Sequence, residues 1–249
     1  MIILFQILYG GSAGLYILAF CLHLLKRRSG ERAAGFAGLV CNLMALVSLY
    51  LDKGRLPIFE IFDVLLVVTF VLAGLVGIRR ETGHTLPDIA FWAWLTVLLI
   101  MGSTLFFVFI PPHMNRIDVD YPFMLLFHGA RVLGLAFILF ASCHYIQYLV
   151  ERNSPQIRGG TIHMGRNYAF LSVLLFLLAE YAGMIWCLEG WADVWHWSGG
   201  FFMSTAIVLY LVLILHLPAA RRGYEKARGV IGGASGYLIA ALMIIRHTT

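Results

Sequence analysis

The chain has 249 residues, of which 61% are apolar and 12% are charged, and its formal net charge is +5. Soluble domains have about 45–50% apolar and about 25% charged residues, so this composition excludes a cytosolic enzyme, a disordered chain and a disulfide-stapled secreted domain. With a mean hydropathy of +0.85, the sequence predicts a polytopic helical membrane protein.

Eight apolar segments follow one another along the chain, and most are long enough to cross a hydrocarbon core about 30 Å thick. The apolar runs are continuous rather than alternating, which favours helices over barrel strands. We predict spans at Ile2–Leu25, Ala34–Leu51, Ile58–Ile78, Ile89–Ile110, Pro122–Val150, Tyr168–Leu188, Gly200–Leu217 and Val230–Ile245, the last being the shortest. The fold class is therefore an all-α membrane bundle. Because neither a repeat nor a linker divides the chain, residues 1–249 are predicted to form a single integral-membrane domain.

Basic residues gather in the loops after the first, third, fifth and seventh predicted spans. These loops hold 13 of the 18 Lys and Arg residues. By the positive-inside rule this side is cytoplasmic, which places both termini outside. Topology explains the excess of positive charge, so no nucleic-acid partner is needed. The four cysteines lack CxxC spacing and are predicted to be free, which excludes a thioredoxin-like site and a covalent CxxCH haem site.

The nine histidines divide by their expected depth in the membrane. Three belong near the inner ends of different spans: His23, His144 and His216. Four lie at or near the outer face: His113, His128, His196 and His247. The remaining two, His84 and His163, fall in predicted cytoplasmic loops and receive no role.

A neutral imidazole is a good axial ligand for haem iron, and ionisable groups within spans are functional candidates by default. We therefore predict that at least one histidine pair at matched depth binds haem or another metal. The favoured inner pair is His23 with His216, and His144 is the reserve. The alternative for each histidine is a hydrogen bond to a neighbouring helix, and for His144 the polar flank of Ser142 and Gln147 favours this alternative.

Arg131 falls one helical turn after His128, within the outer part of the fifth predicted span. A buried guanidinium needs an anion, and a haem propionate would supply one with bidentate geometry. The alternative is a salt bridge to Glu180 in the sixth span or to Asp63 in the third.

Four of the six tryptophans lie within twelve residues: Trp186, Trp191, Trp195 and Trp197. An interfacial aromatic belt would scatter such residues over many helix ends. Their density in one predicted external loop instead favours a flat apolar platform that could cover a large planar ligand.

The stretch 183–198, which runs on into the seventh span and ends at Leu215-His216, resembles the tryptophan-rich "WWD" segment of the cytochrome c assembly superfamily. Three further stretches are similar to parts of that family. Gly54-Arg-Leu-Pro57 followed by Asp63 resembles its Gly-x-x-Pro segment with an acidic residue six positions later. His128 resembles the histidine that opens the helix before the tryptophan segment, and His216 with Arg221 beyond it resembles the family's intramembrane histidine and basic turn.

The chain also departs from the family pattern. Ser198-Gly-Gly stands where the segment usually continues Pro-Lys-Glu, His196 replaces a small residue, and His247 lies 31 residues after His216 where about 40 is usual. These departures favour a divergent or HemX-like member over a complete haem-attaching synthase.

The resemblance implies haem handling in c-type cytochrome biogenesis. Haem b, one or two per chain, would bind through the inner histidines, with Arg131 and Asp63 as further site residues. Haem would also be presented outside beneath the tryptophan segment, with His128 and His113, His196 or His247 as axial ligands. The implied partners are an apocytochrome c or a multihaem cytochrome and other membrane assembly subunits. The chain would hold the haem in part of a cytochrome c haem lyase system, and no catalytic nucleophile or general base of its own stands out.

Two other functions suit the same residues. A di-haem b electron-transfer subunit of a quinol-linked complex would also place ligands at two depths. A haem-free scaffold that recruits haem-synthesis enzymes would use the histidines for packing only.

Overall fold

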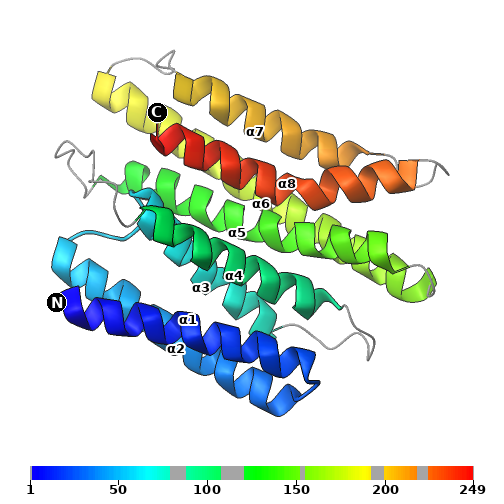
Figure 1. Ribbon diagram of the computed structural model, residues 1–249. Coiled ribbons are helices and arrows are strands. Elements are labelled where there is room, and N and C mark those ends of the chain that lie inside the picture. The colour runs from blue at the N-terminus through cyan, green and yellow to red at the C-terminus, as the bar shows by residue number, and fades with distance from the viewer. Residues whose placement is uncertain are drawn as a thin grey trace. The chain divides into compact units, whose positions relative to one another are not determined.

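The computed structural model describes residues 2–78, 88–107, 121–151, 155–191, 199–217 and 224–248, without the side chains of 2, 155–158, 191, 199–201, 225 and 246–248. Helices make up nearly all of this part of the chain (Figure 1). They are α1 (Ile2–Leu24), α2 (Arg28–Lys53), α3 (Ile61–Ile78), α4 (Ile89–Phe107), α5 (Pro122–Val150), α6 (Pro155–Trp191), α7 (Gly199–His216) and α8 (Tyr224–Thr248).

Seven of these helices are long and apolar enough to cross a membrane; the apolar part of α7, Phe202–His216, is shorter. The protein is thus a polytopic membrane helical bundle, which confirms the predicted fold class. The helix α6 begins at Pro155, well before the predicted start at Tyr168. The prediction began too late because hydropathy marks only the apolar part of a helix. The helix itself starts at Pro155, and proline is a favourable first helical residue. The prediction that His163 lies in a loop is therefore wrong, because this residue is part of α6.

The chain divides into two compact units, Met1–Pro112 and His113–Thr249, called unit 1 and unit 2 below. Unit 1 holds α1 to α4, in which α1 packs against α2 and α4, and α3 packs against α2 and α4. One of its core clusters joins Leu46 and Leu49 of α2 to Leu66 of α3 and Met101 of α4.

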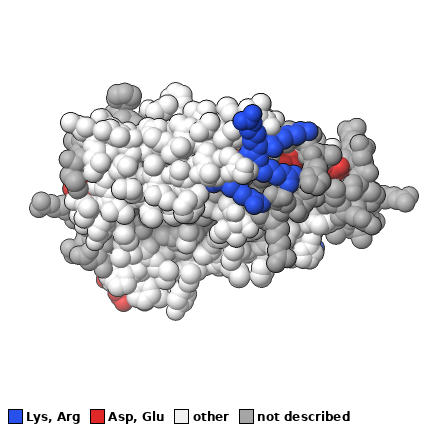
Figure 2. Space-filling view, turned by 90° about the horizontal axis from the view of Figure 1, so that it is seen from below, with Lys and Arg blue, Asp and Glu red and all other residues white. Residues whose placement is uncertain are grey.

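Lys26 closes α1 with a left-handed backbone (φ 57°), and α2 begins two residues later. Figure 2 shows Lys and Arg side chains gathered at one end of the face that α1 and α2 present, while the rest of that face is almost free of charge. The described basic residues of this turn are Lys26, Arg27, Arg28 and Arg32. A short turn therefore concentrates positive charge at one end of an apolar hairpin.

In unit 2, α5 packs against both α6 and α8, and α7 packs against α6 and α8. Glycines permit the close contact between α5 and α8: a Cβ at Gly236 would lie 2.6 Å from the Cα of Leu139. The hydroxyl of Ser142 accepts a hydrogen bond from the Gly236 N–H at 2.8 Å and donates one to the carbonyl of Gly232 at 3.1 Å. Small residues at a helix interface are the usual way for membrane helices to approach closely.

Candidate functional site

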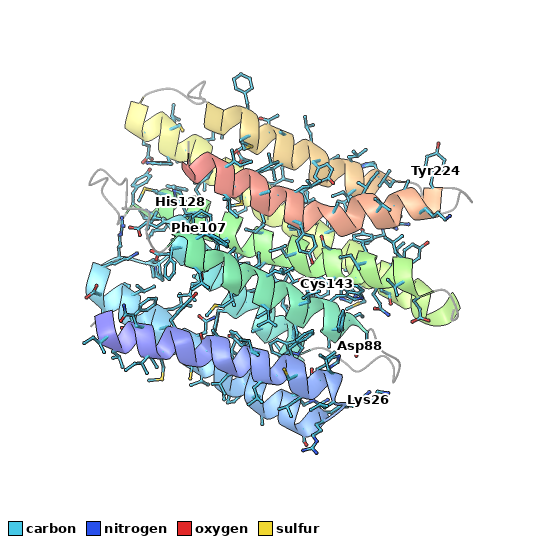
Figure 3. The ribbon with its side chains drawn as sticks, viewed as in Figure 1. Lys26, Asp88, Phe107, His128, Cys143 and Tyr224 are labelled. Carbon is cyan, nitrogen blue, oxygen red and sulfur yellow. The ribbon has the colours of Figure 1, made fainter. Side chains whose placement is uncertain are left out.

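His128 lies in the second turn of α5, near the end of unit 2 at which α5 begins (Figure 3). Its ring is 6.4 Å, centroid to centroid, from the ring of Trp186 on α6, and Phe127 lies 6.0 Å from the same indole. A Cβ at Gly183 would lie 2.8 Å from the Phe127 ring, so glycine there allows α6 to approach α5. The structure thus brings together two residues predicted to belong to one site, His128 and Trp186.

Arg131 is buried one turn further along α5. Its Nη1 donates a hydrogen bond to the hydroxyl of Ser204 on α7 at 2.8 Å and lies 3.9 Å from Oε1 of Glu180 on α6. Its guanidinium carbon lies 5.0 Å from the centroid of the Phe127 ring. Of the two salt bridges considered for Arg131, the one to Glu180 is therefore present, at the long end of the ion-pair range.

His216 is the last residue of α7 and is exposed. Its Nδ1 donates a hydrogen bond to the carbonyl of Val212, one turn earlier, at 2.9 Å. A proton held on Nδ1 leaves the Nε2 lone pair available, and this is the tautomer in which histidine binds metal through Nε2. The geometry of His216 therefore suits an axial ligand.

His144, in contrast, is buried between α5 and α6. It stacks on the ring of Tyr168 at 5.5 Å and meets the edge of Phe140 at 5.1 Å. Its Nδ1 is buried and has no hydrogen-bond partner within the described part of the chain. The polar neighbour Ser142 is used elsewhere, against α8, so His144 meets a neighbouring helix through its ring rather than through a hydrogen bond of Nδ1.

His23 is buried near the end of α1, and both of its ring nitrogens face carboxylates. Nδ1 donates to Oε2 of Glu31 on α2 at 2.9 Å, and Nε2 lies 3.0 Å from Oδ1 of Asp88, the residue before α4. The other oxygen of Glu31 accepts a hydrogen bond from Nε1 of Trp94 at 2.9 Å. Figure 3 shows Asp88 and Lys26 at the same end of unit 1. An iron bond from His23 would have to replace one of these contacts.

A cavity of about 360 Å³ adjoins this cluster in unit 1. Glu31, Arg32 and Trp94 contribute the polar part of its lining, and Phe36 and Gly74 contribute to its apolar walls. The cavity can hold a predominantly apolar molecule with a small polar group.

Asp63 lies in the first turn of α3 and is almost completely buried. Lys53, the last residue of α2, donates to both of its carboxylate oxygens at 2.8 and 2.7 Å and to Oε2 of Glu60 at 2.8 Å. Arg55 also contacts Glu60. Lys53 of unit 1 therefore neutralises Asp63, and not Arg131, the partner that the sequence offered as an alternative.

Several predicted site residues lie outside the described part of the chain. His113, His196, Trp195 and Trp197 belong to undescribed segments, and for Trp191 and His247 only the backbone is described. The tryptophan segment was predicted to be an external loop, but α6 continues to Trp191, so its first half is helical. The platform itself and the pair of His23 with His216, whose residues belong to different units, stay predictions.

The sequence reasoning did not find the partners of His23. Glu31, Asp88 and Trp94 were not singled out, although Glu31 and Asp88 are acidic residues beside predicted span ends, which was a usable signal. No group of three or more His, Cys, Asp or Glu side chains suited to a metal ion occurs within the described residues. Haem needs only one or two axial ligands, so single histidines such as His216 are sufficient donors for it.

Comparisons of this chain with protein-family models, with curated proteins and with solved structures gave no match.

Proposed function

We propose that this protein is a haem-binding membrane protein that acts in c-type cytochrome biogenesis. It holds haem b through histidines of its helices and presents haem beneath the tryptophan-rich segment on the outer face. The basic loops lie in the cytoplasm of a bacterial-type inner membrane, and both termini lie outside. The partners are an apocytochrome c or a multihaem cytochrome and further membrane assembly subunits.

The observation that carries this proposal is the hydrogen bond between Nδ1 of His216 and its own helix. The hydrogen bond from Nδ1 to the Val212 carbonyl fixes the ring and directs its proton away from Nε2. A histidine that only stabilised the end of its helix would make this same hydrogen bond through Nδ1. Such a role would not require the other ring nitrogen, Nε2, to belong to an exposed side chain. The bound haem would supply an iron centre for that nitrogen, and the protein would orient it and adjust its electronic properties.

The outer site rests on the contact between His128 and Trp186. An indole beside an imidazole provides an apolar surface next to a metal ligand, as a planar macrocycle requires. Arg131, one turn away, has a guanidinium that could donate hydrogen bonds to the carboxylate of a haem in addition to its bond to Ser204. With His216 at the far end of α7 from Gly199, unit 2 then contains ligands for two separate haem positions.

The test is the absorption spectrum of protein purified with haem, in oxidised and reduced forms. We expect His216→Ala to lose most of the Soret absorption of the inner haem, and added imidazole to restore it in part. His163→Ala is the matched control, because His163 is also exposed but its Nδ1 accepts a hydrogen bond from Asn167. Equal spectra for wild type and both variants would refute the ligand assignment.

A quinol-linked electron-transfer subunit is the second candidate, and the cavity in unit 1 favours it. A quinol has an apolar body and a hydroxyl donor, and the cavity combines apolar walls with the carboxylate of Glu31 in its lining. Reduction of the purified protein by quinol at turnover rates would support this candidate over cytochrome assembly. A haem-free preparation of intact protein would exclude both.

A further inference from the structure

Arg228 carries a buried positive charge that makes no ion pair with the described residues of unit 2. It lies one turn into α8, at the end of unit 2 marked by Tyr224 in Figure 3, and its side chain is 3% exposed. Its Nε and Nη2 are buried and have no hydrogen-bond partner within the described residues. An unpaired charge in such a place is costly, so a partner is expected.

A buried hydroxyl lies beside it. Tyr145 of α5 is fully buried, and no described side chain or backbone group accepts the proton of its hydroxyl. The guanidinium of Arg228 acts on the oxygen of this hydroxyl both as a donor and as a positive charge, and Arg166 on α6 adds a second positive charge. Three helices therefore direct donors and positive charge to one place, where the described residues place no carboxylate in an ion pair with Arg228.

Close helix packing fixes the position of this group. A Cβ at Gly232 of α8 would lie 2.5 Å from the Tyr145 ring, and one at Gly165 of α6 would lie 3.5 Å from the same ring. A Cβ at Gly229 would lie 2.4 Å from a methyl carbon of Leu149. The ring of Tyr145 is thus held between two glycine surfaces, and its hydroxyl cannot move away from Arg228 to find another partner.

We propose that the Arg228–Tyr145 pair is a binding site for a phosphate oxyanion, the headgroup phosphate of a membrane lipid or a free phosphate. A phosphate group offers several acceptor oxygens, which match the forked donors of arginine and the tyrosine hydroxyl. Arg166, which is exposed, adds positive charge beside the Tyr145 hydroxyl. This site belongs to unit 2 but involves neither His216 nor the tryptophan segment, so it is independent of haem binding.

The experiment uses delipidated full-length protein and two probes. Native mass spectrometry measures retention of phosphatidylglycerol against a galactosyl diacylglycerol that has the same tails and no phosphate. Thermal unfolding measures stabilisation by inorganic phosphate and pyrophosphate. Binding of the phospholipid alone identifies a headgroup site, and stabilisation by the inorganic anions identifies a site for soluble phosphate.

Arg228→Gln is expected to weaken the affinity for whichever probe the wild-type protein binds by at least tenfold, because charge-assisted hydrogen bonds are the strong ones. Lys226→Gln removes the same charge from an exposed position two residues away and should change binding less than twofold. If Arg228→Gln does not fold, Tyr145→Phe removes only the hydroxyl and should weaken binding about threefold. The proposal fails if wild type binds neither probe, or if Arg228→Gln and Tyr145→Phe both bind like Lys226→Gln.

Discussion

The buried polar groups of the two units differ in the partners that the described residues provide for them. In unit 1 every buried charged group of the His23 and Asp63 clusters faces an opposite charge: His23 contacts Glu31 and Asp88, and Asp63 contacts Lys53. Among the described residues of unit 2, several buried or helix-end polar atoms lack such a partner: Nδ1 of His144, Nε and Nη2 of Arg228 and the proton of the Tyr145 hydroxyl, while His216 bonds through Nδ1 to its own helix. The described ionisable residues of unit 1 therefore join helices to one another, whereas those named in unit 2 are the ones that our proposals assign to ligands.

This difference shows why a histidine's place in the sequence is a poor guide to its role. His23 and His216 both lie in the last turn of an apolar helix. One of them has carboxylates at both nitrogens, and the other, as far as the described residues go, bonds to its own helix alone. The number of occupied ring nitrogens, rather than the depth of the residue, separates a structural histidine from a candidate ligand.

The strongest way to test the structural role of unit 1 is to replace Glu31 by leucine. This change leaves the indole N–H of Trp94 and the Nδ1 of His23 without their acceptor. We expect Glu31→Leu to lower the free energy of unfolding by about 3 kcal/mol, as breaking a buried ion pair does, measured by reversible unfolding in detergent micelles. Glu31→Gln, which keeps an acceptor for Trp94, should lose less.

Asp52→Leu is the matched control for Glu31→Leu. Asp52 lies near the end of α2 and is exposed, so its replacement removes the same charge without breaking a buried contact. Wild-type stability of the Glu31→Leu protein would contradict the view that the His23 cluster holds unit 1 together.

Unit 2 depends instead on close helix packing, which Gly236→Ala should disrupt. The new Cβ would lie 2.6 Å from the Cα and 2.8 Å from the backbone nitrogen of Leu139, and backbone atoms cannot rotate away. Separation of α5 from α8 would also stretch the hydrogen bond from the Gly236 N–H to Ser142. We expect a loss of about 2 kcal/mol of unfolding free energy, within the usual range for overpacking.

Gly102→Ala provides the comparison in unit 1, because a Cβ at Gly102 meets nothing within 4 Å. Alanine is also the better helix former, by about 1 kcal/mol. Gly102→Ala should therefore be neutral or stabilising under the same conditions. Equal effects at Gly102 and Gly236 would mean that close α5–α8 packing is not what stabilises unit 2.

Much of the fold followed from hydropathy, because an apolar run long enough to cross a membrane has few alternatives to a helix. The fifth span was predicted with its observed bounds, Pro122–Val150. The start of α6 was missed because the residues from Pro155 to Asn167 are too polar to extend an apolar run, although they continue the helix. Hydropathy does not distinguish a polar helical extension from a loop.

The site was harder to predict, because side-chain partners depend on helix rotation and on turns. Glu31 reaches His23 because Lys26 reverses the chain in only a few residues, and no periodic pattern records that turn. Asp88 comes from a different part of the sequence altogether. By contrast, the neighbourhood of His128 and Trp186 could be anticipated, because α5 and α6 are consecutive and antiparallel neighbours usually pack together.

The smallest expected effect concerns Arg131, a buried cation of unit 2 whose partners lie on two neighbouring helices. Ser204→Ala removes the hydroxyl that accepts its hydrogen bond at 2.8 Å and leaves Glu180 at 3.9 Å as the remaining acid. We expect a loss of about 1 kcal/mol in unfolding free energy, between the average for hydrogen bonds within membranes and the value for bonds to charged groups. Ser103→Ala in unit 1 is the control, because the bond that the described residues give the Ser103 hydroxyl runs to the Ile100 carbonyl of its own helix. A larger loss for Ser103→Ala than for Ser204→Ala would contradict the assignment of Ser204 as a partner of Arg131.

The haem spectrum of Ser204→Ala then separates the two roles considered for Arg131. A Soret band unchanged from wild type means that the guanidinium only joins α5 to α6 and α7, whereas a shifted or weakened band means that Ser204 orients it toward the haem.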